Sequence, residues 1–348
     1  MKNEATSHSE DLRVSHLRWW WTERSSHQCI TTSHSMSTTF PAWYCCVVLF
    51  LFFLFLIPTA TMAGAKENLL LIGWDGVQYN HLQEMLSAGE LPNLSRFPVL
   101  VRTEITDHAT STKPGWVQIL TGLEASVSGT RSNGIYRPFP QRACLFDILK
   151  KDAPGRNLWT AFVAGKDHHL GSMGPGVRWI DGDGKPTSSR DGEPWFHARK
   201  SFDLWMGDMD RDADEVGTLA ISLLDRFAKR NQFAVFVHFA DPDCKGHRFG
   251  ENSPEYSQAV SDCDAWLGRI LGKLDELGVA GKTLVAVVTD HGFDEGEFRH
   301  HRSYDAWLAV RTHRNPRWHD GDQKDVAPTL LRIMGSGTEG MTGKPLWW

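Results

Sequence analysis

The chain carries little excess charge of either sign. Its 348 residues include 37 lysines and arginines and 42 aspartates and glutamates, which gives a formal net charge of −5. A net charge this small does not indicate a nucleic-acid clamp, and we expect no nucleic-acid partner. Cysteine is also scarce, because six residues are too few and too scattered for a disulfide scaffold. With 41% hydrophobic residues, the composition is typical of a globular protein and excludes disorder or a multi-span membrane protein.

Long apolar runs are missing except for one near the N-terminus. Residues 47–57 are all apolar, and Pro58 and the small residues Ala63, Gly64 and Ala65 follow them. Such a pattern is typical of the hydrophobic segment and the cleavage site of a signal peptide. The run is shorter than the roughly 20 residues that a membrane-spanning helix needs. We therefore predict cleavage after Ala65 and export to the periplasm or the extracellular space.

Basic residues are missing from the stretch directly before this run, so other translation starts remain open. No lysine or arginine lies between Arg24 and Lys66, although a signal peptide usually begins with a basic region. Translation from Met36 gives a signal peptide of conventional length, still without basic residues. Translation from Met62 removes the signal and leaves the protein in the cytoplasm. Residues 42–57, if left uncleaved, would serve as a membrane anchor.

From Asn68 onward, short apolar runs alternate with helical stretches. Four runs are suited to strands buried on both faces, at residues 69–74, 158–163, 233–239 and 284–289. Between the runs lie stretches with apolar residues at helical spacing, such as residues 254–277. This alternation predicts an α/β fold with a mostly parallel central sheet and helices on both faces. We expect an N-terminal extension over residues 1–65 and a single domain over residues 66–348, with a loop-rich insert at about 165–214.

Ionisable side chains follow three of the predicted strands at the point where each strand ends. Asp75 directly follows the first strand, Asp243 and His247 follow the third, and Asp290 and His291 follow the fourth. The carboxyl ends of parallel strands line the ligand crevice of an α/β sheet, so these side chains should converge. Carboxylates and imidazoles without cysteine suit a divalent metal such as zinc or manganese. One such residue alone is more often a helix cap, but three clusters at three strand ends indicate a metal site.

A hydroxyl group suited to act as a nucleophile precedes a predicted helix. Ser111, Thr112, Lys113 and Pro114 lead into an apolar stretch at residues 115–120, with Thr112 expected at the N-cap. On this segment alone, capping is the favoured role of Thr112. A nearby metal changes the balance, because it can hold the hydroxyl as an alkoxide near neutral pH. The free amides of the helix start would then face an anionic substrate.

Taken together, these segments resemble the alkaline phosphatase superfamily. The shared motifs are GWDG at residues 73–76, T-x-P-x6-T-G at 112–122, P-D-x-x-G-H at 242–247 and T-D-H-G at 289–292. The pattern is most similar to the type I phosphodiesterase/nucleotide pyrophosphatase branch, with sulfatases and cofactor-independent phosphoglycerate mutases as relatives. The resemblance covers roughly residues 68–335, and the combined pattern is far more specific than any one motif.

The resemblance implies two divalent metal ions, for which zinc is the preferred identity and manganese the alternative. The residues implied for the first ion are Asp75, Thr112, Asp290 and His291. The residues implied for the second ion are Asp243, His247 and a further histidine. For that histidine we prefer His301, which precedes a short segment leading into an apolar strand. The alternatives that remain open are His300, His313 and His319.

The activity that the resemblance implies is hydrolysis of a small phosphoric ester through a phosphothreonine intermediate at Thr112. The phosphodiesterase branch carries an asparagine 21 residues after the nucleophile, which here is Asn133 and would bind a phosphoryl oxygen. A sulfatase would show cysteine or serine at the nucleophile and normally arginine four residues later, where this chain has Thr112 and Trp116. The alternatives are a phosphomonoesterase, a sulfatase, a phosphotransferase or mutase of the same superfamily, and a metal-binding protein without catalytic activity.

Overall fold

The computed structural model describes residues 67–348 apart from several short gaps. The gaps are residues 153–156, 167–170, 177, 181–185, 189–190, 208, 230–231 and 313–315, and only the backbone is described at 178–180 and 186–188. The predicted signal peptide, its cleavage site and His313 therefore lie outside the described residues. All described residues belong to one compact unit.

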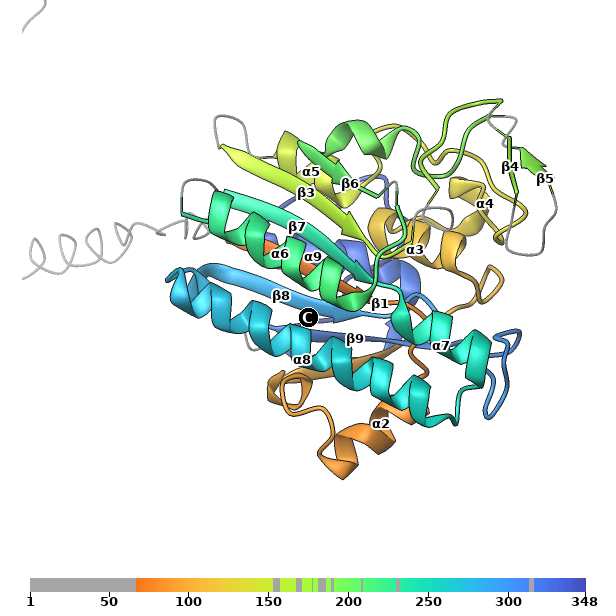
Figure 1. Cartoon of the computed structure of the whole chain (residues 1–348). Helices are drawn as coiled ribbons and strands as arrows, with labels where there is room; N and C mark the ends of the chain where they lie inside the picture. The colour runs from red at the N-terminus through yellow and green to blue at the C-terminus, as the bar shows by residue number, and fades with distance from the viewer. Residues whose placement is uncertain are drawn as a thin grey trace, which may run out of the picture. The chain divides into compact units, whose positions relative to one another are not determined.

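Within the described part of the chain, eight strands form one sheet, and the strands that carry the predicted site lie at its centre (Figure 1). In spatial order they are β10 (Gly321–Asp322), β2 (Val99–Glu104), β9 (Asp305–Arg311), β8 (Thr283–Val288), β1 (Asn68–Trp74), β7 (Gln232–Phe239), β3 (Leu158–Ala164) and β6 (Leu204–Met206). Within the described chain, β9 is the one strand of this sheet that runs antiparallel to its neighbours. The predicted mostly parallel α/β sheet is therefore confirmed.

The central strands form because both of their faces are apolar. In β1, Leu70, Ile72 and Trp74 enter one hydrophobic core, whereas Leu69 and Leu71 enter a second core on the opposite face. This alternation follows from the two-residue period of a strand. Strands β7 and β8 are divided between the two cores in the same way. A sheet buried on both faces needs helices on both sides, because each apolar face must be covered.

Helices cover both faces of the sheet, as predicted (Figure 1). The first core is covered by α2 (Tyr79–Ala88), α6 (Ala213–Phe227) and α8 (Pro254–Glu276), and the second by α3 (Thr112–Thr121), α5 (Leu145–Lys151) and α9 (Val326–Met334). The other described helices are α4 (Ala125–Ser128), α7 (Asp241–Phe249), η1 (Leu94–Arg96), η2 (Ala198–Ser201), η3 (Ala280–Lys282) and η4 (Gln323–Asp325). No helix among the described residues is long and apolar enough to cross a membrane.

Part of the predicted insert joins the main sheet. Strand β6 extends the sheet beyond β3, while β4 (Arg178–Ile180) and β5 (Pro186–Ser188) form a separate antiparallel pair. The insert thus follows β3 at the same edge of the sheet to which β1, β7 and β8 deliver their carboxyl ends. That edge carries the candidate site.

Candidate functional site

The parallel register of β1 and β8 brings two predicted aspartates side by side. Gly73 pairs with Val288, and continuing this register by two residues brings Asp75 level with Asp290. Gly76 then turns the chain with a φ of 73°, a value that favours glycine. Its backbone N–H donates to Asp290 Oδ1 at 3.2 Å, which ties the end of β1 to the end of β8.

Most of the predicted acidic and histidine residues gather in two adjoining groups of side chains that could each hold a metal ion. The first group consists of three buried residues, Asp75, Asp290 and His291. The second group consists of Asp243, His247 and His300. In each group, one ligand atom from every residue lies within 4.8 Å of the others. The groups adjoin because His291 Nε2 lies 3.7 Å from Asp75 Oδ1 and 3.9 Å from Asp243 Oδ1.

Helix α7 explains why two members of the second group face each other. Asp243 and His247 are four residues apart, so both project from one side of the helix, with Asp243 Oδ1 3.4 Å from His247 Nε2. A Cβ atom at Gly246 would lie 2.5 Å from the Phe293 ring. Glycine at this position therefore lets Phe293 pack against α7, where its ring also meets that of His247.

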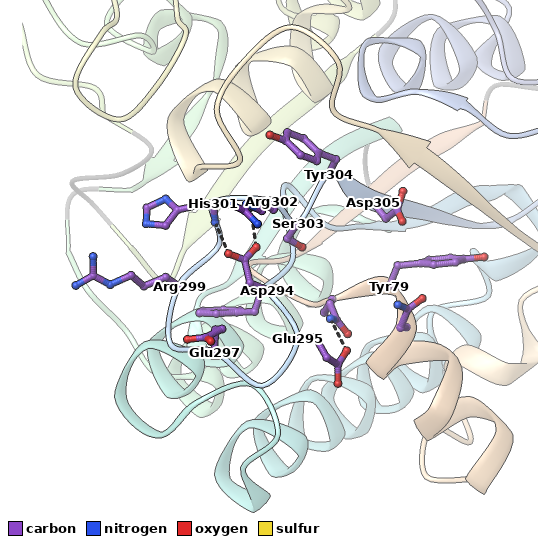
Figure 2. A pocket seen from close by; sticks show the side chains of 13 residues that line it. Tyr79, Asp294, Glu295, Glu297, Arg299, His301, Arg302, Ser303, Tyr304 and Asp305 are labelled. Carbon is purple, nitrogen blue, oxygen red and sulfur yellow. Dashed lines mark hydrogen bonds between the residues drawn. The ribbon is translucent and has the colours of Figure 1, made fainter.

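The structure places His300, and not the preferred His301, in the second group. His300 Nε2 lies 3.1 Å from His247 Nε2 and 3.9 Å from Asp243 Oδ1. His301 is exposed and lines a separate cavity of about 630 Å³ beside Asp294 and Arg302 (Figure 2). The reason is local, because the Asp294 carboxylate accepts the backbone N–H of both residue 301 and residue 302. His319 stacks on the C-terminal Trp348 and belongs to neither group.

Thr112 lies at the junction of the two groups. Its Oγ1 is 3.3 Å from His291 Nε2, and its side chain is buried. The expected N-cap position is wrong by one residue, because Ser111 is the N-cap and Thr112 is the first residue of α3. Its hydroxyl is thus not needed for capping. A Cβ atom at Gly115 would lie 2.6 Å from the backbone oxygen of Asp290, so glycine lets the start of α3 approach the first group closely.

Two contacts made by Lys113 fix the start of α3, one through its backbone and one through its side chain. Asn133 Oδ1 accepts the backbone N–H of Lys113 at 2.9 Å, which leaves the Nδ2 donor on the other side of the amide. The Lys113 side chain is buried and pairs with the buried Glu193 at 3.3 Å. It also lies over the Tyr136 ring, 4.1 Å from the centroid. The insert, which contributes Glu193, is thereby attached to the helix that carries Thr112.

The donor set fits a divalent cation in each group. Asp290 Oδ2 in the first group and Asp243 Oδ1 in the second are buried and, among the described residues, accept no hydrogen bond. A buried carboxylate oxygen without a partner is unfavourable, and a bound cation removes the penalty. Oxygen and imidazole nitrogen ligands without thiolate suit zinc or manganese.

Two histidines of the site, His291 and His300, are in the form that binds metal. Burial, followed by the neighbouring His300, lowers the pKa of His291 to about 3. Burial also lowers the pKa of His300. Both imidazoles are therefore neutral near pH 7 and keep a lone pair for a cation. Burial and the adjacent Asp75 raise the pKa of Asp290, because a second carboxylate close by and the loss of solvent both disfavour its charged form.

Sequence reasoning missed two residues that contact the ligand groups. Lys166 Nζ lies 3.2 Å from Asp75 Oδ1 and also pairs with Asp243 Oδ2. Burial lowers the pKa of Lys166, but Asp243 and Asp75 raise it by more, so it carries its proton. His238 Nε2 lies 2.9 Å from Asp75 Oδ2, and its ring is fully buried. Two features of the sequence could have found them: a lysine shortly after a predicted strand, and a histidine within an otherwise apolar strand.

The sequence matches the model of the type I phosphodiesterase/nucleotide pyrophosphatase family over residues 69–335. The chain therefore belongs to this family, and the resemblance stated from its motifs is confirmed. Among solved structures, a protein in the alkaline phosphatase superfamily from Vibrio parahaemolyticus shares the fold. That comparison has a TM-score of 0.52 at 17% identity and covers 81% of this chain and 70% of the other.

Curated relatives match this chain over part of their length. Ectonucleotide pyrophosphatase/phosphodiesterase family member 7 of Homo sapiens is 25% identical, over 66% of this chain and 48% of that protein. A 2,3-bisphosphoglycerate-independent phosphoglycerate mutase of Sulfurimonas denitrificans is 32% identical, over 35% of this chain and 24% of its own length. The chain thus spans about half of the first protein and about a quarter of the second.

Proposed function

We propose that this protein hydrolyses phosphoric esters, as a phosphodiesterase or nucleotide pyrophosphatase, with Thr112 as the nucleophile at a site of two divalent metal ions. The observation that carries the proposal is the position of Thr112 Oγ1, 3.3 Å from His291 Nε2 at the junction of two groups of metal-ligand side chains. Family membership and the similarity to the human ectonucleotide pyrophosphatase/phosphodiesterase support this reaction class. The substrate would be a small molecule.

The ligand assignment follows the two groups. The residues proposed for one ion are Asp75, Thr112, Asp290 and His291. The residues proposed for the other are Asp243, His247 and His300, with His300 replacing His301. The bound ions, zinc by preference, would supply the positive charge that favours an ionised threonine hydroxyl and stabilises charge on the phosphoryl oxygens.

The residues of the chain then have distinct tasks. Thr112 Oγ forms a bond to phosphorus while the bond from phosphorus to the leaving oxygen breaks, which gives phosphothreonine and a free alcohol or phosphate. The Asn133 Nδ2 group and the backbone amides at the start of α3 donate to the remaining phosphoryl oxygens. Water later breaks the bond between Thr112 and phosphorus, which releases the phosphate product and restores the hydroxyl.

The reaction class is tested by comparing three chromogenic substrates. Purified protein with added zinc should release nitrophenol from p-nitrophenyl phosphate or bis-p-nitrophenyl phosphate, and much more slowly from p-nitrophenyl sulfate. Removing the metal with EDTA should abolish the activity, and added zinc or manganese should restore it. A dominant rate on the sulfate would contradict the proposed branch, and activity that persists in EDTA would contradict metal dependence.

We also propose that the protein is exported after removal of the N-terminal segment. The support is the apolar run at residues 47–57 with small residues before Lys66. Sequencing the N-terminus of the protein isolated from its source should give a chain that begins at Lys66. A chain that begins at Met62 or earlier would contradict cleavage at this point.

A further inference from the structure

We propose that Lys166 is a positioning residue that joins the two groups of metal ligands. Its ammonium group would hold Asp75 of the first group and Asp243 of the second at a fixed separation, and would offset their charge before metal binds. The inference rests on the proposed function, because it takes both carboxylates to be metal ligands.

The geometry gives Lys166 one contact in each group. Its Nζ atom lies 3.2 Å from Asp75 Oδ1 and forms an ion pair with Asp243 Oδ2. Side-chain exposure is 9% for Lys166, 0% for Asp75 and 6% for Asp243. These contacts are therefore buried, where solvent screens them little.

The path of the chain after β3 makes this contact possible. Lys166 follows β3 by two residues, and β7 lies between β3 and β1 in the sheet. The lysine thus spans β7 to reach Asp75 at the end of β1. Gly165 brings the chain close, because its N–H donates to the His238 carbonyl oxygen at 2.9 Å. A Cβ atom at Gly165 would lie 3.0 Å from the Cβ of Ala240, in the turn after β7.

The individual oxygen atoms show that Lys166 leaves room for a metal in the second group. It pairs with Asp243 Oδ2, whereas the other oxygen, Oδ1, faces His247 and His300 and accepts no hydrogen bond among the described residues. In the first group, His238 binds Asp75 Oδ2 and Lys166 binds Oδ1, the oxygen that also lies 3.7 Å from His291 Nε2, so the carboxylate is held at both oxygens. At Asp243, Lys166 therefore contacts the oxygen that faces away from the histidines, as the outer partners of metal ligands do.

Charge explains why a lysine is useful at this position. Asp75, Asp243 and Asp290 are buried near one another, and like charges at such positions repel each other strongly. Without metal, Lys166 supplies a positive charge to two of the three carboxylates. Removing it should therefore destabilise the metal-free protein much more than the metal-loaded protein, because bound cations would take over the compensation.

The test compares thermal unfolding of the full chain with EDTA and with zinc. Zinc should raise the Tm of the wild type. With EDTA, Lys166→Met should lower Tm by at least about 5 °C, and zinc should bring it to within about 2 °C of the loaded wild type. Lys166→Arg keeps the positive charge and should lower Tm by less. The matched control is Lys150→Met, whose partner Asp203 is partly exposed, and it should shift Tm by less than about 2 °C in both conditions.

Each other outcome is informative. An unchanged Tm of Lys166→Met in EDTA together with a raised KM would make Lys166 a substrate-binding residue and overturn the inference. If Lys166→Met lowers Tm equally with and without zinc, Lys166 only stabilises the fold, and the inference is again overturned. If zinc leaves the wild-type Tm unchanged, the proposed metal site itself fails.

A double variant keeps the test decisive even if Lys166→Met unfolds in EDTA. Adding Asp243→Asn removes one of the carboxylates that Lys166 compensates, so it should recover part of the Tm lost in Lys166→Met. No recovery would mean that the two residues are not coupled, which would overturn the inference.

Discussion

Replacing Thr112 by alanine should lower kcat by at least about a thousandfold, equivalent to about 4 kcal/mol of transition-state stabilisation. The hydroxyl lies 3.3 Å from His291 Nε2 and is buried at the start of α3. Without it, the proposed nucleophile at the junction of the ligand groups is lost. The remaining ligands of the first group, Asp75, Asp290 and His291, should still hold metal. Measured zinc content should therefore change little while turnover collapses.

Two further variants distinguish loss of the nucleophile from loss of helix stability. Thr121→Ala removes the same atoms at the other end of α3, where the hydroxyl donates to the Val117 carbonyl oxygen at 2.6 Å. It should cost some stability and leave kcat within about threefold, because Thr121 is remote from the ligand groups. Thr112→Ser restores a hydroxyl and should recover measurable turnover. Wild-type protein quenched during turnover should carry a phosphoryl group on Thr112 by mass spectrometry. Full activity of Thr112→Ala would refute the assignment.

Much of the fold could be predicted because its strands are marked by unbroken apolar runs. The predicted strand at residues 69–74 differs from β1 by one residue, and the predicted helix at 254–277 differs from α8 by one residue at its end. Both follow from local patterns: apolar residues on both faces of a buried strand, and a Ser253 cap followed by Pro254 in the first turn of the helix.

The convergence of the aspartates could also be predicted, because parallel strands deliver their carboxyl ends to one edge. What local pattern could not decide was the direction of single side chains. Ser111 and Thr112 both suit an N-cap, so only the three-dimensional structure shows that Ser111 occupies it. Lys166 was overlooked because a lysine after a strand is usually solvated, and its contact with Asp75 joins residues 91 positions apart.

The sequence also could not decide which of His300 and His301 points into the site. Replacing His300 is the second substitution for which we expect a large effect. His300→Ala should lower the zinc content of the protein toward one ion per chain and lower kcat by at least about a hundredfold. His300 Nε2 lies 3.1 Å from His247 Nε2, and its ring stacks on His291 with centroids 4.1 Å apart. His301→Ala is the matched control, because its side chain is exposed and faces a different cavity. It should keep both the zinc content and kcat within about twofold.

The measurements are elemental analysis of dialysed protein and steady-state kinetics over a range of zinc concentrations. High zinc should partly restore His300→Ala, because Asp243 and His247 still offer two ligands. This rescue distinguishes a lost ligand from a damaged loop, since His300 Nδ1 also contacts the Thr110 carbonyl oxygen at 2.5 Å and a loop defect would not respond to zinc. The reverse order, with His301→Ala losing zinc and His300→Ala unaffected, would restore the sequence-based choice of His301. That result would require the loop at residues 294–302 to change conformation when metal binds. In this structure the Asp294 carboxylate accepts the backbone N–H groups of residues 301 and 302, which fixes the loop.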